Sequence, residues 1–477
     1  MSGDNKKSDN VALKAGVWYV ASSVIVRAIS VITTPIFTRL LSTAEYGTVS
    51  TFTSWYNLLL TFYTMNLTYS IGRAKLEYES KLDEYIGSMQ TLSGIVSLIL
   101  SVIIVAFVEP ISRIFELSIP ATVLLAIYLF FAPAIQFYQN GYRYRYKYKQ
   151  NIAIAWYTTV GTVLLSLLFV ITHDSNKAEW RMFGIVLPTV LLSCAFGINS
   201  IRKNNINFNR SYWKYGLSLS GPLIIHTLSL NILSQSDRVF ISKICGAEDT
   251  ALYSLVYSYS LLLSIVMNAI SDGWLPWFHD NLYIGNKEGI KKNSQDLVIL
   301  GCYIALACIG FAPEAVYILG GREYLQALPC VLPIVLGVLC QYIYTHYVNI
   351  EMHLKKTKYV SEGTIFATVL NLILNAIFIP TFGYVAAAYT TLVSYFALMI
   401  VHFIITRKKL GMKLYNDVFM FSSMIFTSII GAFVSLAYDY TVMRILIILV
   451  GFVSFLVYFQ SYLGQFIDKY IKQRERR

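Results

Sequence analysis

The sequence carries little charge for its length. Only 13% of its 477 residues are Asp, Glu, Lys or Arg, about half the share found in soluble domains, whereas 56% are hydrophobic. A soluble fold of this size could not bury so much apolar surface, so the second solvent must be lipid. The composition therefore predicts an all-α integral membrane protein.

The sequence also lacks the short motifs of catalysis and metal binding. It contains no GxSxG, no HExxH and no P-loop, which argues against hydrolase chemistry and against direct use of ATP by this chain. Its six cysteines are scattered without CxxC or metal-ligand spacing, so we interpret them as small core residues. We expect no catalytic residues, no metal and no cofactor.

Long apolar runs recur from one end of the chain to the other. A spanning helix needs about 20 mostly apolar residues. Polar breaks divide the sequence into fourteen such runs: 12–33, 46–68, 86–108, 119–138, 151–172, 178–200, 215–236, 249–272, 295–312, 327–350, 360–379, 383–405, 417–437 and 442–462. We therefore expect about fourteen transmembrane helices.

The placement of Lys and Arg tests this count independently. When the first turn of each run is counted with the adjoining loop, 29 of the 38 basic residues lie in alternate segments beginning with the N-terminus, 8 lie in the opposite loops, and Arg27 lies deep within a span. Cytoplasmic loops carry the excess of Lys and Arg, and a missed helix would disrupt the alternation. The sequence predicts a multi-pass protein with both termini in the cytoplasm.

The loop GYRYRYKYK (Gly141–Lys149) alternates Tyr with Arg or Lys. Interleaved basic and aromatic residues can bind nucleic acid. Directly after a membrane span, however, the pattern favours interfacial tyrosines and positive charge in contact with anionic lipid. We expect no nucleic-acid partner.

The two halves of the chain resemble each other at an offset of 204 residues. The stretch RLLSTAEYGTVS after the first run corresponds to KICGAEDTALYS after the seventh. Polar residues also follow one face of the first and seventh helices at matching positions. This pattern predicts two pseudo-symmetric six-helix bundles around a central cavity, residues 1–214 and 215–405, with two additional transmembrane helices and a basic tail at 406–477.

Three stretches carry a resemblance to a known family: PIFTRLLSTAEYG (Pro35–Gly47), SDRVFISKICGAEDTALYS (Ser236–Ser254) and NLILNAIFIPTFGYVAAAYTT (Asn371–Thr391). Their order and spacing resemble the polysaccharide transporters of the multidrug, oligosaccharidyl-lipid and polysaccharide exporter (MOP) superfamily, which include O-antigen and capsule-repeat flippases.

The resemblance implies export of a polyprenyl-diphosphate-linked oligosaccharide across the bacterial cytoplasmic (inner) membrane by alternating access, for O-antigen, capsule or exopolysaccharide biosynthesis. Its implied partners are that lipid-linked substrate, membrane lipids and other polysaccharide-assembly proteins.

Arg27 is the most informative polar residue within a span. It lies thirteen residues beyond Lys14, about 20 Å along a helix, where an arginine costs a few kcal/mol unless it faces a cavity or a partner. We expect the two polar stripes to supply substrate contacts, namely Ser23, Arg27, Ser30, His226, Asn231 and Arg238. The alternatives are snorkelling or bracing by Arg27 and packing hydrogen bonds by His226 and Asn231.

A second polar group offers hard oxygen ligands. Asn371 and Asn375 are four residues apart on one helix face, and with Asp237 and Thr391 they could bind a sodium ion. The resemblance implies coupling to ions through this region, with sodium or protons as the coupled ion. Hydrogen bonding between helices is the alternative role for these side chains.

Two other functions remain open. A drug or organic-cation antiporter of the same superfamily would share the fold, but we find no carboxylate deep in the first six runs, where the resemblance would place one. A membrane-bound polysaccharide polymerase or acyltransferase needs a sizeable catalytic loop, and no predicted outer loop exceeds about fifteen residues.

Overall fold

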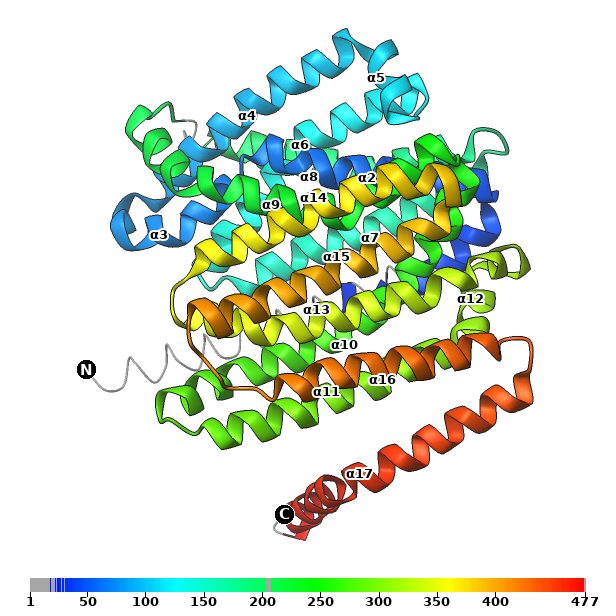
Figure 1. Cartoon of the computed structure of the whole chain (residues 1–477). Helices are drawn as coiled ribbons and strands as arrows, with labels where there is room; N and C mark the ends of the chain where they lie inside the picture. Colours follow the sequence, from blue (N-terminus) through cyan, green and yellow to red (C-terminus); the bar gives the residue numbers. More distant parts are fainter. Residues whose placement is uncertain are drawn as a thin grey trace.

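The structure, a computed structural model, is built from long helices (Figure 1). It describes residues 18, 22, 24–26, 28, 29, 31–202 and 207–475, with the backbone alone at 201, 202, 222 and 461–475. Within these residues eleven helices are long and apolar enough to cross a membrane, and a twelfth is formed by the bent pair Arg210–Gly221 and Leu223–Ile244. No strand occurs among them. The prediction of an all-α membrane protein is confirmed, while the count of fourteen stays a prediction.

The helices follow the predicted runs in order. The first group is α2 (Thr43–Thr64), α3 (Ser70–Glu77), α4 (Leu82–Ala106), α5 (Val108–Phe115), α6 (Ile119–Tyr144), α7 (Tyr148–Thr172), α8 (Lys177–Arg202) and α9 (Arg210–Ile244). The second is α10 (Ala247–Tyr283), α11 (Lys287–Gly310), α12 (Ala312–Gly320), α13 (Val331–His353), α14 (Thr357–Phe382), α15 (Tyr384–Ile404), α16 (Asp417–Leu436) and α17 (Thr441–Glu475). Between them lie three 3₁₀ helices, η1 (Leu67–Tyr69), η2 (Glu79–Lys81) and η3 (Arg322–Cys330), and a short π-helix, η4 (Ile405–Lys409).

Local sequence explains where several helices begin and end. α2 begins at a capping box, in which the Glu45 backbone N–H donates to Ser42 Oγ (3.2 Å) and the Ser42 N–H donates to Glu45 Oε2 (2.8 Å). Gly383 separates α14 from α15 with a φ of 69°, a left-handed conformation that glycine adopts without steric cost. Gly383 therefore ends α14 and allows α15 to begin directly after it, while Pro380 lies within α14.

α2 is too polar to count among the helices that could cross a membrane by their hydropathy, although it packs among the other helices. Several of its hydroxyl groups are satisfied within the helix, because Thr48, Thr51 and Thr53 each donate to the carbonyl four residues earlier. Such back-bonding reduces the number of unpaired polar groups in a Ser- and Thr-rich helix that lies among other helices.

The molecule has two ends, which we name by a residue or helix at each. The α12 end, on the right in Figure 1, holds α5, α12 and the starts of α2 and α8. The Arg407 end, on the left, holds α3 and the segment between α15 and α16. The charge pattern predicts that the α12 end faces outward and the Arg407 end faces the cytoplasm.

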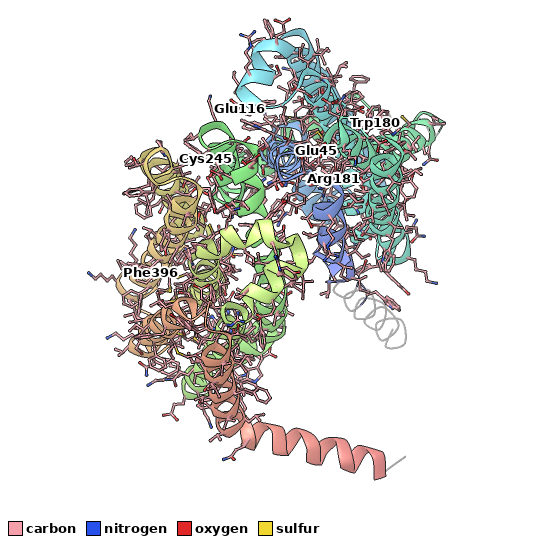
Figure 2. All side chains as sticks on the ribbon, turned by 90° about the vertical axis from the view of Figure 1, so that its right-hand side faces the viewer. Glu45, Glu116, Trp180, Arg181, Cys245 and Phe396 are labelled. Atoms are coloured by element: carbon pink, nitrogen blue, oxygen red, sulfur yellow. The ribbon has the colours of Figure 1, made fainter. Side chains whose placement is uncertain are left out.

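The helices gather in two groups (Figure 2). α2, α4, α6, α7 and α8 pack on one another, and so do α10, α11, α13, α14 and α15, while α9 contacts both α2 and α14. α16 packs on α11, and α17 projects away from the other helices (Figures 1 and 2). The boundaries at residues 214 and 405 stay predictions.

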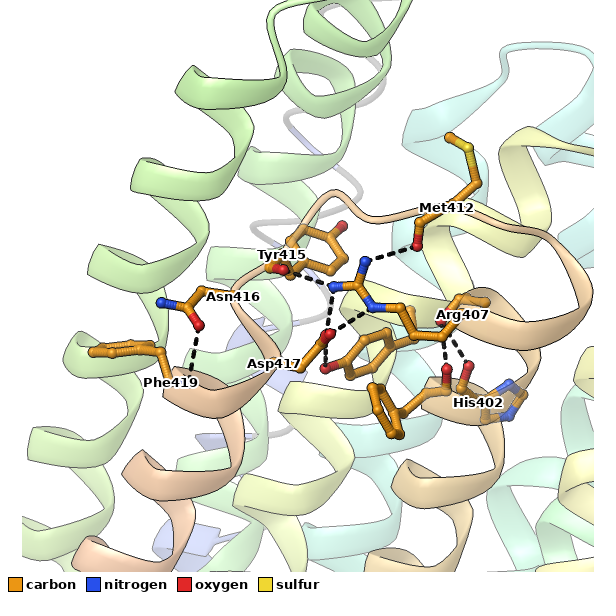
Figure 3. A network of polar contacts seen from close by, with 10 residues as sticks. His402, Arg407, Met412, Tyr415, Asn416, Asp417 and Phe419 are labelled. Atoms are coloured by element: carbon orange, nitrogen blue, oxygen red, sulfur yellow. Dashed lines mark hydrogen bonds and ion pairs between the residues drawn. The ribbon is translucent and has the colours of Figure 1, made fainter.

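A polar network fixes the chain where it leaves α15 (Figure 3). The Arg407 guanidinium pairs with both carboxylate oxygens of Asp417, Nε with Oδ2 at 2.5 Å and Nη2 with Oδ1 at 2.6 Å. It also donates to the Tyr415 carbonyl (2.6 Å) and the Met412 carbonyl (2.9 Å), and Tyr347 OH on α13 donates to Asp417 (3.1 Å). A bidentate pair of this kind holds a single geometry, so the start of α16 is tied to α13 and α15.

α9 bends by 48° between its halves Arg210–Gly221 and Leu223–Ile244. Position 222 is a proline, which lacks an N–H and crowds the carbonyl four residues before it, a common cause of kinks. On the first half, Trp213 Nε1 donates to the Ser88 carbonyl of α4 (3.0 Å). On the second half, the Ser229 carbonyl accepts from Thr368 Oγ1 of α14 (2.9 Å). The second half also donates to Thr61 of α2 through Asn231 Nδ2 (2.8 Å). The first half is thus attached to one group of helices, and the second half is attached to both.

Candidate functional site

Asp237 is a carboxylate buried among α9, α10, α14 and α15, with 1% of its surface exposed. Tyr253 OH and Thr391 Oγ1 each donate to its Oδ2 at 2.6 Å, and Asn375 Nδ2 donates to its Oδ1 at 2.7 Å. All three donors are neutral. The residues come from four different helices, so the site depends on how these helices pack.

Asn371 joins the same network. Its Oδ1 accepts from Asn375 Nδ2 and from Ser236 Oγ, both at 3.1 Å, and its Nδ2 donates to Thr391 Oγ1 at 3.3 Å. The structure therefore brings together all four residues that the sequence singled out for a cation. It adds Ser236, Tyr253 and Thr390, whose hydroxyl donates to Asn375 Oδ1.

The neighbouring Arg238 makes no ion pair with this carboxylate. Arg238 follows Asp237 in the chain, but its Nη1 donates to Gln235 Oε1 (2.7 Å) and its guanidinium lies 4.1 Å from the centre of the Tyr257 ring. A buried carboxylate whose hydrogen-bond donors are all neutral carries an uncompensated charge, which costs several kcal/mol.

The network has the chemistry that a sodium ion requires. Hydroxyl, amide and carboxylate oxygens are hard ligands. The amide of Asn375, turned about its last torsion angle, would present its oxygen toward Asp237 in place of its nitrogen. A bound cation or a proton would remove the uncompensated charge.

The polar stripe of α9 faces α2. Asn231 Nδ2 donates to Thr61 Oγ1 (2.8 Å) and to the Asn57 carbonyl (3.3 Å), and Thr227 Oγ1 accepts from Asn66 Nδ2 (3.0 Å). Asn231 thus makes the contacts between helices that were the alternative to substrate binding. Nearby, His226 Nδ1 is buried and lacks a hydrogen-bond partner within the described part of the chain.

Ser23, Arg27 and Ser30 lie outside the described residues, so their assignment to substrate stays a prediction from the sequence.

Polar contacts join the two helix groups at the α12 end. Thr38 Oγ1 donates to the Leu319 carbonyl at the end of α12 (2.5 Å), and Thr43 Oγ1 donates to Glu323 Oε2 of η3 (3.1 Å). Both bonds link residues about 280 positions apart in the sequence.

Close packing of side chains and backbone also holds the two helix groups together at the α12 end. The rings of Tyr46 on α2 and Tyr324 on η3 meet edge to face, with centroids 6.2 Å apart. One residue further, a Cβ added at Gly47 would collide with the Ala247 carbonyl oxygen at the start of α10. α2 and α10 can approach this closely only because Gly47 has no side chain.

Arg181 is a polar residue that the sequence did not single out. It lies on α8 near the α12 end (Figure 2), with its guanidinium 4.1 Å from the centre of the Phe37 ring and 5.1 Å from that of Tyr46. Its Nη1 is buried without a hydrogen-bond partner in the region the structure describes. Aromatic faces stabilise such a cation only in part, so Arg181 retains the capacity to bind an anion.

Comparisons with known proteins agree with this architecture. Residues 12–282 match the model of the family described as "Polysaccharide biosynthesis protein". An uncharacterized membrane protein of Methanocaldococcus jannaschii is 20% identical over 424 residues, which are 82% of each chain.

Two solved structures show a similar fold. The lipid II flippase MurJ in an inward closed conformation superposes with a TM-score of 0.73 at 13% identity, over 94% of this chain and 100% of that chain. An inward-facing multidrug resistance MATE family transporter of the MOP superfamily gives a TM-score of 0.57 at 14% identity, over 81% of this chain and 94% of that chain. Since the family match covers more than half of the sequence, this chain belongs to the polysaccharide biosynthesis protein family, and its fold is that of the MOP superfamily.

Proposed function

We propose that this protein is a flippase that moves a polyprenyl-diphosphate-linked oligosaccharide across the cytoplasmic membrane by alternating access, for O-antigen, capsule or exopolysaccharide synthesis. The observation that carries the proposal is the extent of the two structural likenesses. The flippase fold extends over 94% of this chain, whereas that of the multidrug transporter extends over 81%. Membership of a polysaccharide biosynthesis family favours a saccharide cargo over a drug.

Such a cargo requires cations for its diphosphate. Arg27 would bind the diphosphate within the membrane, because a planar guanidinium donates two parallel hydrogen bonds to phosphate oxygens and stays charged at physiological pH. Arg181 would then bind the diphosphate nearer the outer surface. Its unpaired Nη1 becomes accessible once Tyr46 and Tyr324 separate.

The contacts at the α12 end support an alternating-access cycle. The bonds of Thr38 and Thr43 to the α12 region hold this end together, so we propose that cargo enters from the Arg407 end and leaves after these contacts part. The two helix groups would be the two bundles that move. The buried charge of Asp237 supports coupling of this movement to a sodium ion or a proton.

Transfer in proteoliposomes tests the function. Vesicles containing the protein and an undecaprenyl-diphosphate-linked oligosaccharide are treated with an impermeant glycosidase, and the fraction cleaved is compared with that in protein-free vesicles. We expect cleavage to exceed the half exposed at the start and to depend on the protein. Mass spectrometry of the uncleaved lipid should show unchanged chain length and acylation, because a polymerase or acyltransferase would alter them.

An organic cation provides the matched negative control. Ethidium should not accumulate in or leave the same vesicles at a rate above the protein-free background. Transport of ethidium without transfer of the lipid-linked oligosaccharide would assign the chain to drug export instead.

A further inference from the structure

A polar pocket of about 570 Å³ lies at the Arg407 end, between the ends of α4, α6 and α8. It is separate from the Asp237 network, which lies among α9, α10, α14 and α15. Its volume is within the range of small-molecule sites, about 300–1,000 Å³. Its lining includes Gln90 of α4, Tyr142 of α6, Asn199 of α8, and two cations from the Gly141–Lys149 segment, Arg145 and Lys147.

The end of α6 aims these two cations. The Lys147 N–H donates to the Tyr142 carbonyl (2.9 Å) and the Tyr146 N–H donates to the Arg143 carbonyl (3.1 Å), while Tyr146 has a φ of 56°. This is a Schellman motif, which reverses the chain after a helix. It returns Lys147 to the pocket and leaves Arg143 exposed outside it.

The absence of a side chain at Gly141 makes room for the guanidinium group of Arg145. A Cβ at Gly141 would lie 3.3 Å from Arg145 Nη1, so the Arg145 guanidinium lies directly against α6. There it pairs with Asp83 at the start of α4. The pair leaves this part of the pocket electrically neutral.

Lys147 remains as the unneutralised charge. Its ammonium group makes no ion pair with any residue that the structure describes, and the side-chain amides of Gln90 and Asn199 make no hydrogen bond there either. The pocket therefore presents one net positive charge beside two free amide donors. That combination suits an anion with several acceptor oxygens.

We propose that this pocket binds the phosphate group of an anionic lipid headgroup. The pocket lies where helices α4, α6 and α8 end, which is the level of the headgroups of the predicted cytoplasmic leaflet, and that leaflet is the one rich in anionic lipid. Lys147 pairs with the phosphate, and the amides of Gln90 and Asn199 donate to its oxygens. The proposal does not depend on the flippase function, because a membrane phospholipid and a diphosphate carrier lipid share this chemistry.

The chain offers a matched control for surface electrostatics. Arg143 lies four residues before Lys147 in the same basic segment, is exposed, and does not line the pocket. General attraction to an anionic surface weakens similarly whichever of the two charges is removed. If the pocket holds the phosphate, lipid binding weakens only when the charge of Lys147 is removed.

Native mass spectrometry of the purified full-length protein, titrated with phosphatidylglycerol in detergent, tests the proposal. We expect one tightly bound lipid in the wild-type protein, about tenfold weaker binding in Lys147→Gln, and unchanged binding in Arg143→Gln. Asn199→Trp fills the pocket without changing the charge and should also weaken binding. Thermal unfolding of each variant controls for folding, and the two charge variants decide the question if Asn199→Trp does not fold.

Competition identifies the source of the phosphate. The bound phosphatidylglycerol is challenged with undecaprenyl diphosphate or with further phosphatidylglycerol. If undecaprenyl diphosphate displaces the bound lipid at the lower concentration, the pocket is assigned to the carrier lipid. If undecaprenyl diphosphate does not displace it, the pocket is assigned to a phospholipid. Equal weakening by Lys147→Gln and Arg143→Gln, or phosphatidylglycerol binding no tighter than that of phosphatidylcholine, would overturn the proposal.

Discussion

Asp237 offers the sharpest test at the scale of single residues. Its carboxylate is buried and its hydrogen-bond donors are neutral, so a cation bound there should stabilise the folded protein. Replacing choline with sodium should raise the Tm, since a ligand at 100 times its Kd adds about 2.7 kcal/mol. Asp237→Asn should abolish this sodium-dependent shift in a thermal unfolding assay.

The control for this experiment is Asp439→Asn, which removes an exposed carboxylate near the α12 end and should keep the sodium effect. If a proton compensates Asp237 instead, sodium should leave the wild-type Tm unchanged and the Tm should rise as the pH falls. A full sodium shift in Asp237→Asn would exclude the site.

Arg27 carries the prediction for the diphosphate. Arg27→Lys keeps the charge but loses the planar fork, so we expect partial export of the lipid-linked oligosaccharide, and almost none from Arg27→Ala. Membrane abundance should stay normal in both variants, as measured by immunoblotting of membrane fractions.

A purely bracing arginine would behave differently. It would tolerate glutamine, and its removal would lower abundance together with activity. Near-normal export by a well-expressed Arg27→Ala variant would rule out the diphosphate contact.

The cluster of possible cation ligands around Asp237 was predictable from the sequence only in part. Asn371 and Asn375 are four residues apart, so their shared face follows from helix geometry alone. Tyr253 is one of 36 tyrosines, and its bond to Asp237 depends on how α10 packs against α9, which no local pattern reveals. Arg181 was counted among the loop cations because it lies one turn from the start of α8, and only the packing against Phe37 shows that it points inward.

The contact between α2 and α10 gives a prediction at the scale of helices. Gly47→Ala should force these helices apart at the α12 end, because the new methyl group would collide with the Ala247 carbonyl. We expect the distance between spin labels at positions 116 and 322 to increase by several ångström in a cysteine-free background, as measured by electron paramagnetic resonance.

Gly94→Ala is the matched control, since an added Cβ there meets no atom within 4 Å. Both substitutions improve helix propensity by about 1 kcal/mol, so any difference between them comes from the contact. Identical label distances in Gly47→Ala and the wild-type protein would show that α2 and α10 relax locally without separating the helix groups.

Helix positions were more predictable than helix lengths. Hydropathy identifies the part of a helix that lies in lipid, and it predicted a seventh span at 215–236 and an eighth at 249–272. The helices α9 and α10 extend to Arg210–Ile244 and Ala247–Tyr283. Their polar ends remain helical because hydrogen bonding continues beyond the membrane, with Asn209 capping the start of α9.

The orientation of the whole molecule is a prediction that labelling can check. The segments around Lys75, Lys147, Lys291, Lys356 and Lys408 lie together at the Arg407 end (Figure 1), and their charge predicts that this end is cytoplasmic. The same prediction holds for both termini and for the loop around Lys203, which lies outside the described residues. Single cysteines at these positions, in a cysteine-free background, should resist an impermeant maleimide added to intact cells.

A cysteine at position 322, at the α12 end, should react with the same reagent. Strong labelling at 147 or 356 from outside would reverse the orientation and, with it, the proposed direction of transport.

The bend in α9 has a thermodynamic consequence for the whole molecule. Asp237 lies fifteen residues beyond position 222, about 22 Å along the helix, on the half bonded to both α14 and α2, while the other half is bonded to α4. If the two groups rotate, either the second half leaves α2 and the angle at residue 222 changes, or its bond to α14 breaks. A cation that binds more tightly at one angle then increases the population of molecules with that angle. By linkage, the factor of this increase equals the factor by which the angle raises the cation's affinity. Sodium affinity measured with the bend locked by a crosslink would therefore report, without any transport assay, how strongly the ion drives the movement.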